Sequence, residues 1–333
     1  MLRVDDEGVS SQPAAPRPLF EVSGIHDVTS FARILAATVG EAVRGKPESV
    51  GLAVAAVLSG GHILIEDVPG VGKTLLAKSL AQSLGGTFQR IQGTSDLLPS
   101  DITGVTIYDQ EQREWRFRRG AIFANVVLVD EINRATPRAQ SALLEAMEER
   151  QVTVDGSTYA LPKPFVVLAT QNPFGTAGTF PLVDGQLDRF AVVLTLGHPA
   201  RDVERELLLG AGGVTAMADL RPIASPGAVA ALIARVPNVH CAPAVADYIL
   251  DLVGATREHS SVSVGASPRA SLSLLALARA LAVTRGRDYV VPEDVKDAVP
   301  AALAHRIVLG GGTELGGARR LLIEMVRSMP VPA

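Results

Sequence analysis

The chain has 333 residues, of which 47% are hydrophobic and 20% charged, and its formal net charge is −4 at pH 7. This length suits one large α/β unit plus a smaller partner, and the composition excludes a disordered chain. The slightly acidic balance disfavours nucleic acid and anionic membranes as partners, although a local basic patch is compatible with it. Cys241 is the only cysteine, so one subunit can form neither an intrachain disulfide nor a cysteine-based metal cage.

The first 20 residues are expected to form a flexible tail. They contain acids and prolines instead of the basic-then-apolar order of a secretory signal. The longest apolar runs, 51–58 and 272–283, fall well short of the roughly 18 residues needed to span a bilayer. We therefore expect no membrane insertion and a cytoplasmic location.

Apolar periodicity predicts helices over 28–43 and 48–58, followed by a short buried strand over 62–65. A glycine-rich loop comes next, and then a helix that carries Leu76, Leu80 and Leu84 on one face. Residues 94–120 read as an excursion with strands near 102–108 and 115–118. Further predictions are strands at 125–129 and 165–169, a helix over 137–150, and a hairpin over 151–161 that turns at Asp155 and Gly156.

After about Pro199 the pattern changes to amphipathic helices, with no convincing strand. These helices are predicted near 201–209, 226–236, 243–257, 268–284, 292–308 and 317–328. Alternating strands and helices followed by helices alone predict an α/β unit with a parallel sheet and a separate helical domain. The predicted division is a tail over 1–20, a nucleotide-binding core over 21–198 and a helical domain over 199–333.

The segment VPGVGKT, residues 68–74, is a candidate phosphate-binding loop. A glycine-rich turn that opens onto a helix N-terminus aims backbone N–H groups at an anion, and the helix dipole adds to the attraction. Lys73 then places its charge at the β- and γ-phosphates, and the Thr74 hydroxyl can ligate Mg²⁺. The predicted ATP-binding positions are Pro69, Gly70, Val71, Gly72, Lys73, Thr74 and Leu75. Asp67 stands where the full pattern has its first glycine, and a strand–loop–helix corner without a ligand is the alternative interpretation.

A second segment, VVLVDEIN, ends a buried strand with Asp130 and Glu131. Because the carboxyl ends of parallel strands meet at one edge of the sheet, Asp130 is expected beside the loop, where it can hold the Mg²⁺ shell. Glu131 is then placed to orient or deprotonate the attacking water. The alternative for this segment is a solvated acidic pair that closes a strand.

Polar and charged residues downstream complete the candidate site. Asn172 follows the strand FVVLA and is a candidate to position water near the γ-phosphate, although it can also simply cap that strand. Arg189 in LDRF and Arg269 in SPRAS can each meet a phosphate, since the planar guanidinium stabilises spread negative charge. Surface salt bridges are the alternative for both arginines.

The order VPGVGKT, GAIFANVVLVDEINRATPRAQSALLEAMEERQV, VLATQNP, QLDRF and GASPRAS resembles the MoxR-type AAA+ ATPases over nearly all of residues 28–328. The segment 120–152 matches that family better than any generic ATPase. The resemblance implies an AAA+ P-loop core with a parallel sheet flanked by helices, followed by a small all-helical lid. It also implies a ring, usually a homo-hexamer, that binds ATP between neighbouring subunits.

The same resemblance implies residue roles that spacing does not supply. Lys73 and Thr74 are similar to the Walker A pair, Asp130 and Glu131 to Walker B, Asn172 to sensor 1, Arg189 to the arginine finger, Arg269 to sensor 2, and Val43 to Gly45 to the stretch near adenine. The excursion and the hairpin are similar to the two insertions of that clade, which typically face the pore or a partner. The sequence departs from the family at Asp67 and in 174–190, FGTAGTFPLVDGQLDRF, where EQEGTYPLPEAQLDRF is common.

Three functions compete at this point. The leading hypothesis is an ATP-driven remodelling chaperone which, by resemblance, acts with a von Willebrand A-domain partner to mature a client protein. The second is a nucleic-acid motor or loader of the same fold, for which the basic run 116–119, RFRR, is the one notable feature, although a solvated hairpin face explains that run equally well. The third, a nucleotide-binding scaffold without turnover, is disfavoured because every residue type required for hydrolysis is present.

Overall fold

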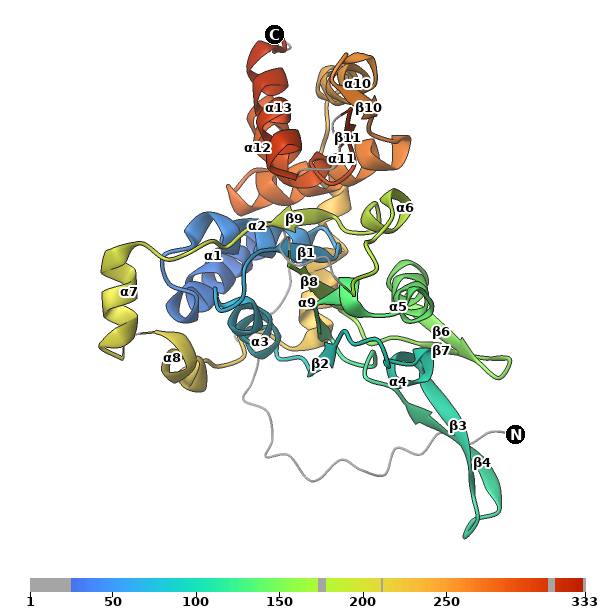
Figure 1. The fold of residues 1–333 in the computed structure, drawn as a ribbon. Coiled ribbons are helices and arrows are strands. Elements are labelled where there is room, and N and C mark those ends of the chain that lie inside the picture. Colours follow the sequence, from blue (N-terminus) through green and yellow to red (C-terminus); the bar gives the residue numbers. More distant parts are fainter. Residues whose placement is uncertain (1–24, 173–177, 211, 311–314, 332–333) are drawn as a thin grey trace.

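A five-stranded parallel sheet is at the centre of the computed structural model, which describes residues 25–172, 178–210, 212–310 and 315–331 (Figure 1). The strands follow the spatial order β2, β5, β8, β1, β9, and each neighbouring pair is parallel. Their bounds are β1 Ile63–Glu66, β2 Phe88–Gln92, β5 Val126–Asp130, β8 Val166–Gln171 and β9 Val192–Leu194. The predicted parallel sheet is confirmed, and its carboxyl edge carries the polar ends of β2, β5 and β8.

Helices cover both faces of the sheet because its strands are apolar on both sides. On β1, Ile63 and Ile65 point into a core shared with the helices on one face, whereas Leu64 points into a second core beneath α5. The helices that contribute to the first core include α1 Ile25–Ala42, α2 Pro47–Leu58, α3 Lys73–Ser83 and α9 Pro226–Ile233. Those on the opposite face are α4 Pro99–Thr103 and α5 Pro137–Glu149.

Two antiparallel hairpins extend from the α5 side, and both were expected from the sequence. The first joins β3 Gly104–Asp109 to β4 Glu114–Arg119 and projects away from the body (Figure 1). The second joins β6 Gln151–Val154 to β7 Ser157–Ala160, with the predicted turn at Asp155 and Gly156. Phe117 of the first hairpin stacks on Tyr159 of the second at a centroid distance of 3.9 Å, which holds their bases together.

The C-terminal part is mainly helical, as predicted. Its helices are α7 Arg201–Leu208, α8 Gly213–Asp219, α10 Pro243–Glu258, α11 Pro268–Thr284, α12 Pro292–Leu303 and α13 Leu315–Ser328. Shorter elements are η1 Ile132–Arg134, α6 Asp184–Leu187 and η2 Val236–Asn238. The expectation of no strand here is wrong for one short antiparallel pair, β10 Val262–Val264 and β11 Val308–Leu309. These strands have only two or three residues, too few to show a periodic pattern.

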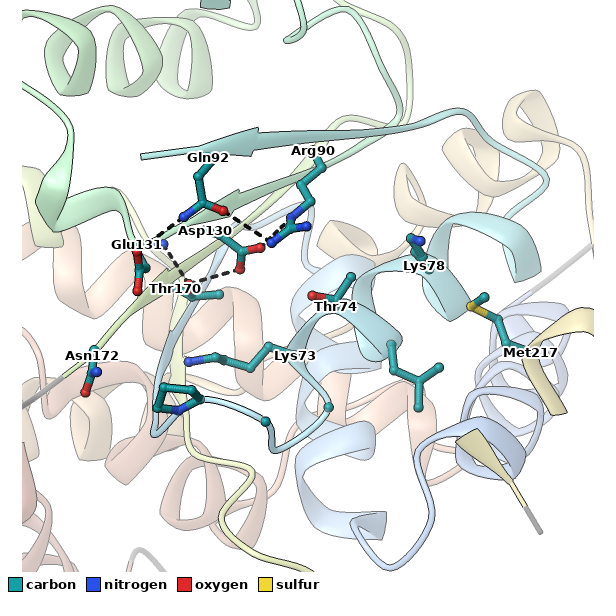
Figure 2. A pocket seen from close by; sticks show the side chains of 14 residues that line it. Lys73, Thr74, Lys78, Arg90, Gln92, Asp130, Glu131, Thr170, Asn172 and Met217 are labelled. Carbon is teal, nitrogen blue, oxygen red and sulfur yellow. Dashed lines mark hydrogen bonds and ion pairs between the residues drawn. The ribbon is translucent and has the colours of Figure 1, made fainter. Parts of the chain in front are cut away.

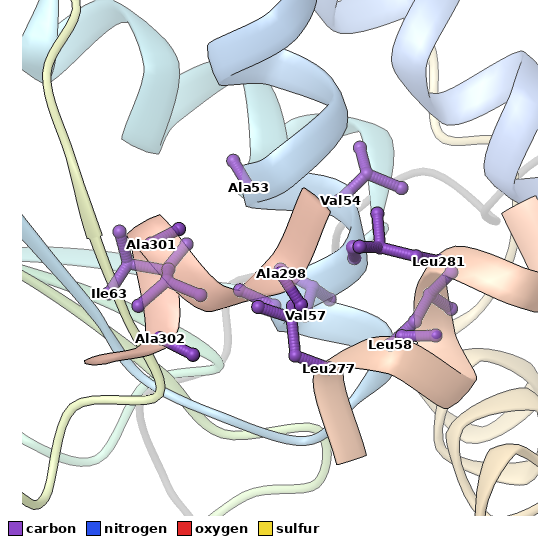
Figure 3. Close-up of a cluster of buried hydrophobic side chains, with 14 of the residues drawn as sticks. Ala53, Val54, Val57, Leu58, Ile63, Leu277, Leu281, Ala298, Ala301 and Ala302 are labelled. Atoms are coloured by element: carbon purple, nitrogen blue, oxygen red, sulfur yellow. The ribbon is translucent and has the colours of Figure 1, made fainter. Parts of the chain in front are cut away.

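The helical part joins the sheet domain through one continuous apolar core. Figure 3 shows Val57 and Leu58 of α2 beside Leu277 of α11 and Ala298 of α12, and all four side chains are buried. In contrast, α8 packs on α1 and α3, and α9 packs on α1 and α2. The boundary predicted at residue 199 stays a prediction, and the predicted tail over 1–20 lies outside the described residues. None of the described helices is both long enough and apolar enough to cross a membrane.

Candidate functional site

A cavity of about 490 Å³ opens at the carboxyl edge of the sheet, above the N-terminus of α3 (Figure 2). It brings together the predicted loop and the predicted polar strand ends. Its lining residues are Pro69, Gly70, Gly72, Lys73, Thr74, Leu75, Lys78, Arg90, Gln92, Asp130, Glu131, Thr170, Asn172 and Met217. This volume lies within the range of small-molecule sites in proteins.

The loop has the backbone geometry of an anion cradle. Gly70 has φ 85° and Gly72 has φ 100°, a region that side chains other than glycine rarely adopt. Helix α3 begins directly at Lys73, so its free N–H groups and its dipole face the cavity. The Lys73 ammonium donates to the backbone carbonyl of Asp67 at 2.8 Å. Burial lowers the pKa of Lys73, while Asp67, Asp130 and Glu131 act in the opposite direction.

Asp67, the departure from the full loop pattern, is a structural tether. Its side chain is buried, and its Oδ2 accepts hydrogen bonds from the backbone N–H groups of Leu196 at 2.7 Å and Gly197 at 2.6 Å. Its Oδ1 accepts from the N–H of Val68 at 2.8 Å. The backbone at Asp67 does not have a positive φ, so this position does not require glycine. The aspartate therefore fixes the base of the loop to the segment after β9.

The two acidic residues at the end of β5 are both held by neighbours. Asp130 accepts a hydrogen bond from Arg90 Nε at 2.6 Å and another from the Thr170 hydroxyl at 3.3 Å. Glu131 accepts from the Gln92 amide at 3.2 Å and from Arg134 at 2.9 Å. Figure 2 shows the Arg90 and Gln92 contacts reaching across from β2.

The backbone of Glu131 is unusual for a side chain of its size. Its φ is 54°, in the left-handed region where non-glycine residues are uncommon. Strain of this kind persists where the surroundings fix it, and the Glu131 N–H is held by the Thr170 hydroxyl at 2.9 Å. The carboxylate is thereby fixed at the edge of the cavity opposite the loop (Figure 2).

Three predicted nucleotide contacts do not line this cavity. Val43 is buried in the main core, and Val71 packs partly buried against the same core. Gly45 has φ 71° and lies so close to Val203 of α7 that an added Cβ would come within 2.9 Å of it. The lining residues that the sequence did not indicate are Lys78, Arg90, Gln92, Thr170 and Met217.

The two candidate arginines lie together, but not at the loop. Arg189 Nε and Arg269 Nη1 each donate to one oxygen of the Glu148 carboxylate, both at 2.9 Å. They line a separate cavity of about 200 Å³ with Asp188 and Arg306. One chain therefore presents the cavity at the glycine-rich loop and the arginine pair as two distinct sites.

Arg306, just after α12, anchors the segment that bears Arg189. Its side chain is only 2% exposed, and it donates to the Asp188 carboxylate at 2.6 Å, the Asp188 carbonyl at 3.0 Å and the Phe190 carbonyl at 2.8 Å. The neighbouring His305 ring bonds to the same Phe190 carbonyl at 2.9 Å. Residues on both sides of Arg189 are thus fixed to the helical domain.

Similar proteins cover almost the whole chain. The family described as "ATPase family associated with various cellular activities (AAA)" matches residues 62–192, and the AAA lid domain matches 254–318. Relatives include "Uncharacterized protein YeaC" of Bacillus subtilis, 44% identical over 86% of this chain and 91% of its own. "Chaperone MoxR1" of Mycobacterium tuberculosis is 42% identical over 91% and 82%.

A solved structure gives the same result at the level of the fold. It is the crystal structure of a protein from Cytophaga hutchinsonii described as "a putative ATPase", with 36% identity and a TM-score of 0.83, and the match covers 92% of this chain and 96% of that one. "Protein MoxR" of Paracoccus denitrificans is 30% identical over 93% of its length. With the loop, the Asp130–Glu131 pair and the helical lid in place, the chain belongs to the MoxR-type AAA+ ATPases and hydrolyses ATP.

Proposed function

We propose that the chain couples Mg²⁺-dependent ATP hydrolysis to the remodelling or maturation of a partner protein, as a chaperone that works in a homo-hexameric ring. The observation that carries this proposal is the separation of the nucleotide cavity from the Arg189–Arg269 pair within one chain. Among the described residues the arginine that lines the cavity, Arg90, is paired with Asp130, so a neighbouring copy that supplies the Arg189–Arg269 pair would complete the site. Repetition of this head-to-tail contact closes a ring. The name of the M. tuberculosis relative, a chaperone, supports the cellular role.

The donor groups in the cavity fit a nucleotide-bound Mg²⁺ ion. The Thr74 hydroxyl and the Asp130 carboxylate both line it, and magnesium prefers oxygen ligands while it keeps several waters. These two residues would hold the ion, which would supply neutralisation of phosphate charge. Arg90 pairs with Asp130 at 2.6 Å, which holds the carboxylate in a fixed orientation at the cavity wall.

The remaining residues have separable tasks in the reaction. Lys73 and the N–H groups at the start of α3 bind the phosphates. Glu131 orients the attacking water and accepts its proton, and Asn172 holds that water in line with the γ-phosphate. The arginine pair of the neighbouring subunit stabilises the charge that spreads over the γ-phosphate oxygens in the transition state.

We infer that the base of the nucleotide binds at the end of the cavity away from the proposed γ-phosphate position. Met217 of α8 lies at the opposite end from Asn172 in Figure 2, and Leu75 is a second apolar lining residue. A flexible thioether and a leucine offer a surface on which an adenine ring can pack. Val43 is buried in the main core and Gly45 packs against Val203, so neither residue contributes to the wall of this cavity.

The alternative of a nucleic-acid motor has less support. In the basic run on β4, Arg116 is already paired with Glu114 at 2.8 Å and Asp109 at 3.4 Å. Turnover that single-stranded DNA stimulates with a steep salt dependence would favour the motor. A von Willebrand A-domain partner and a cytoplasmic location remain predictions from the family resemblance.

A trapping experiment tests the chaperone role. The Glu131→Gln protein should hold ATP without hydrolysing it, so a client that binds the ATP state should be enriched on it in a pull-down. The Lys73→Ala protein, which is expected not to bind ATP, is the control. Equal recovery of every protein on both baits would contradict an ATP-dependent client interaction.

A further inference from the structure

The carboxylate between the two arginines comes from Glu148, in the last turn of α5. One oxygen accepts from Arg189 and the other from Arg269, each at 2.9 Å. These residues come from three separate parts of the fold: α5 of the sheet domain, the segment after α6, and the first turn of α11 in the helical domain. One side chain thus joins the two arginines that are proposed to act on a neighbour's phosphate.

Helix electrostatics oppose this arrangement. A negative charge in the last turn of α5 and a positive charge in the first turn of α11 both face the like-signed end of their own helix dipole. The Glu148 and Arg269 side chains are also 34% and 47% exposed, so their ion pair adds little to stability. Neither the Glu148 charge nor the Arg269 charge stabilises its own helix. We therefore look to function, and not to stability, for the reason that they are present.

Both guanidinium groups keep donors available for another anion. Arg189 uses Nε for Glu148 and Nη1 for the Gly185 carbonyl at 3.0 Å, and Arg269 uses Nη1 for Glu148. Within the described part of the chain, the Nη2 groups of the two arginines make no hydrogen bond. Asp188 Oδ2 also lies 4.0 Å from Arg269 Nε, but Glu148 is the carboxylate that bonds to both guanidinium groups, so its loss leaves the repulsion between the two positive charges less compensated. When Glu148 is present, the unbonded Nη2 groups of the two arginines are held near each other.

We propose that Glu148 is a positioning residue that presents Arg189 and Arg269 as one unit to the nucleotide of the neighbouring subunit. This inference rests on the proposed donation of arginines between subunits. The two arginines bring the positive charge, Glu148 sets their spacing, and Arg306 fixes the backbone of the segment that carries Arg189. The Glu148 pKa is held below its ordinary value by the hydrogen bond from Arg189, so the carboxylate is ionised at neutral pH.

The first test is ATP turnover of Glu148→Gln and Glu148→Asp. An amide keeps the shape but directs N–H groups at a guanidinium, and we expect kcat to fall roughly ten- to a hundredfold through misplacement of the pair. Aspartate keeps the charge but is one methylene shorter, so an intermediate kcat is expected. The ATP dissociation constant should not change, because Glu148 is remote from the subunit's own loop cavity. The matched control is Glu149→Gln, an exposed glutamate one position along α5, with turnover as in the unmodified chain.

The second test separates positioning from a merely structural role. Glu148→Gln subunits have intact loop cavities, and Glu131→Gln subunits have intact arginines, so mixing them should restore turnover at interfaces between the two kinds. A Glu148→Gln protein with unmodified turnover would overturn the proposal. The proposal would also be overturned if Glu131→Gln subunits restore turnover when mixed with Arg189→Ala but not when mixed with Glu148→Gln. Donation of arginines between subunits would then hold, and only the role of Glu148 would fail. Absence of rescue in both mixtures contradicts donation between subunits and, with it, this inference.

Discussion

The Asp67 carboxylate accepts a hydrogen bond from the backbone N–H of Leu196 at 2.7 Å, across 129 positions of sequence. Asp67 follows β1 and Leu196 follows β9, and these strands are neighbours in the sheet. The bond links the two strand ends at Asp67, the residue that immediately precedes the glycine-rich loop. The residue that departs from the usual loop pattern is therefore part of what holds the loop in place.

Restoring the usual glycine should damage the protein. Asp67→Gly removes the acceptor of the buried Leu196 N–H and of the partly buried Gly197 N–H, and makes the loop base more flexible. Hydrogen bonds to charged groups contribute about 1.5–3 kcal/mol each, so the free energy of unfolding should fall by about 3 kcal/mol. ATP binding should weaken as well. Chemical denaturation and nucleotide titration measure both effects, and tighter ATP binding by Asp67→Gly would show that the tether is unimportant.

Substitution of Glu131 should separate binding from turnover. Glu131→Gln keeps the size of the side chain but cannot accept a proton, so turnover should fall roughly 10²- to 10⁴-fold. ATP affinity should stay within about threefold, because the phosphates are bound by the loop and by Lys73. Phosphate release assays and equilibrium nucleotide binding give the two quantities. Unchanged turnover would remove Glu131 from the reaction.

Acid should destabilise the fold through His62. This buried ring accepts the N–H of Val167 on Nδ1 at 3.0 Å and bonds the Met147 carbonyl through Nε2 at 3.1 Å, which requires the neutral form. Burial, aided by Arg150, lowers its pKa to about 4. The unfolded chain therefore binds this proton more readily than the folded chain, and stability is complete above pH 6.5 and falls between about pH 6.5 and 4. Over that window the loss from His62 is about 3 kcal/mol.

The measurement is the free energy of unfolding as a function of pH. Buried His305, whose pKa is also lowered by burial, adds to the same trend. His62→Gln keeps a donor and an acceptor but cannot be protonated, so its stability should depend less steeply on pH. His26→Gln, at an exposed position near the start of α1, should keep the original slope. Equal slopes for all three proteins would exclude His62 as the titrating group.

Buried, continuous strands were predictable from the sequence, whereas edge strands were not. HILI and VVLVD are uniformly apolar because helices cover both faces, and both became central strands. By contrast, β2 has the sequence FQRIQ with only Ile91 buried, and its pairing with β5 comes from tertiary structure. Strand β9 has three residues and helix α8 seven, both too short for periodicity to be recognised.

The contrast between local sequence patterns and tertiary contacts also decides how much of the site could be predicted. The loop and the Asp130–Glu131 pair follow from local spacing, since each is set by one strand and the turn after it. Arg90, Gln92 and Met217 reach the cavity from the elements that the sequence did not reveal. The clustering of Arg189 and Arg269 on Glu148 spans 41 and 121 positions, and no local pattern reports contacts at that range.

The central claim, an ATP site shared between subunits, is tested most directly by mixing two inactive proteins. Arg189→Ala alone should lose roughly a hundredfold or more in turnover while it still binds ATP. At an equal ratio with Glu131→Gln, about a quarter of the interfaces combine an intact loop cavity with an intact arginine pair in a ring with random order. We predict that turnover rises to a matching fraction of that of the unmodified protein. No recovery at any mixing ratio would contradict a shared site.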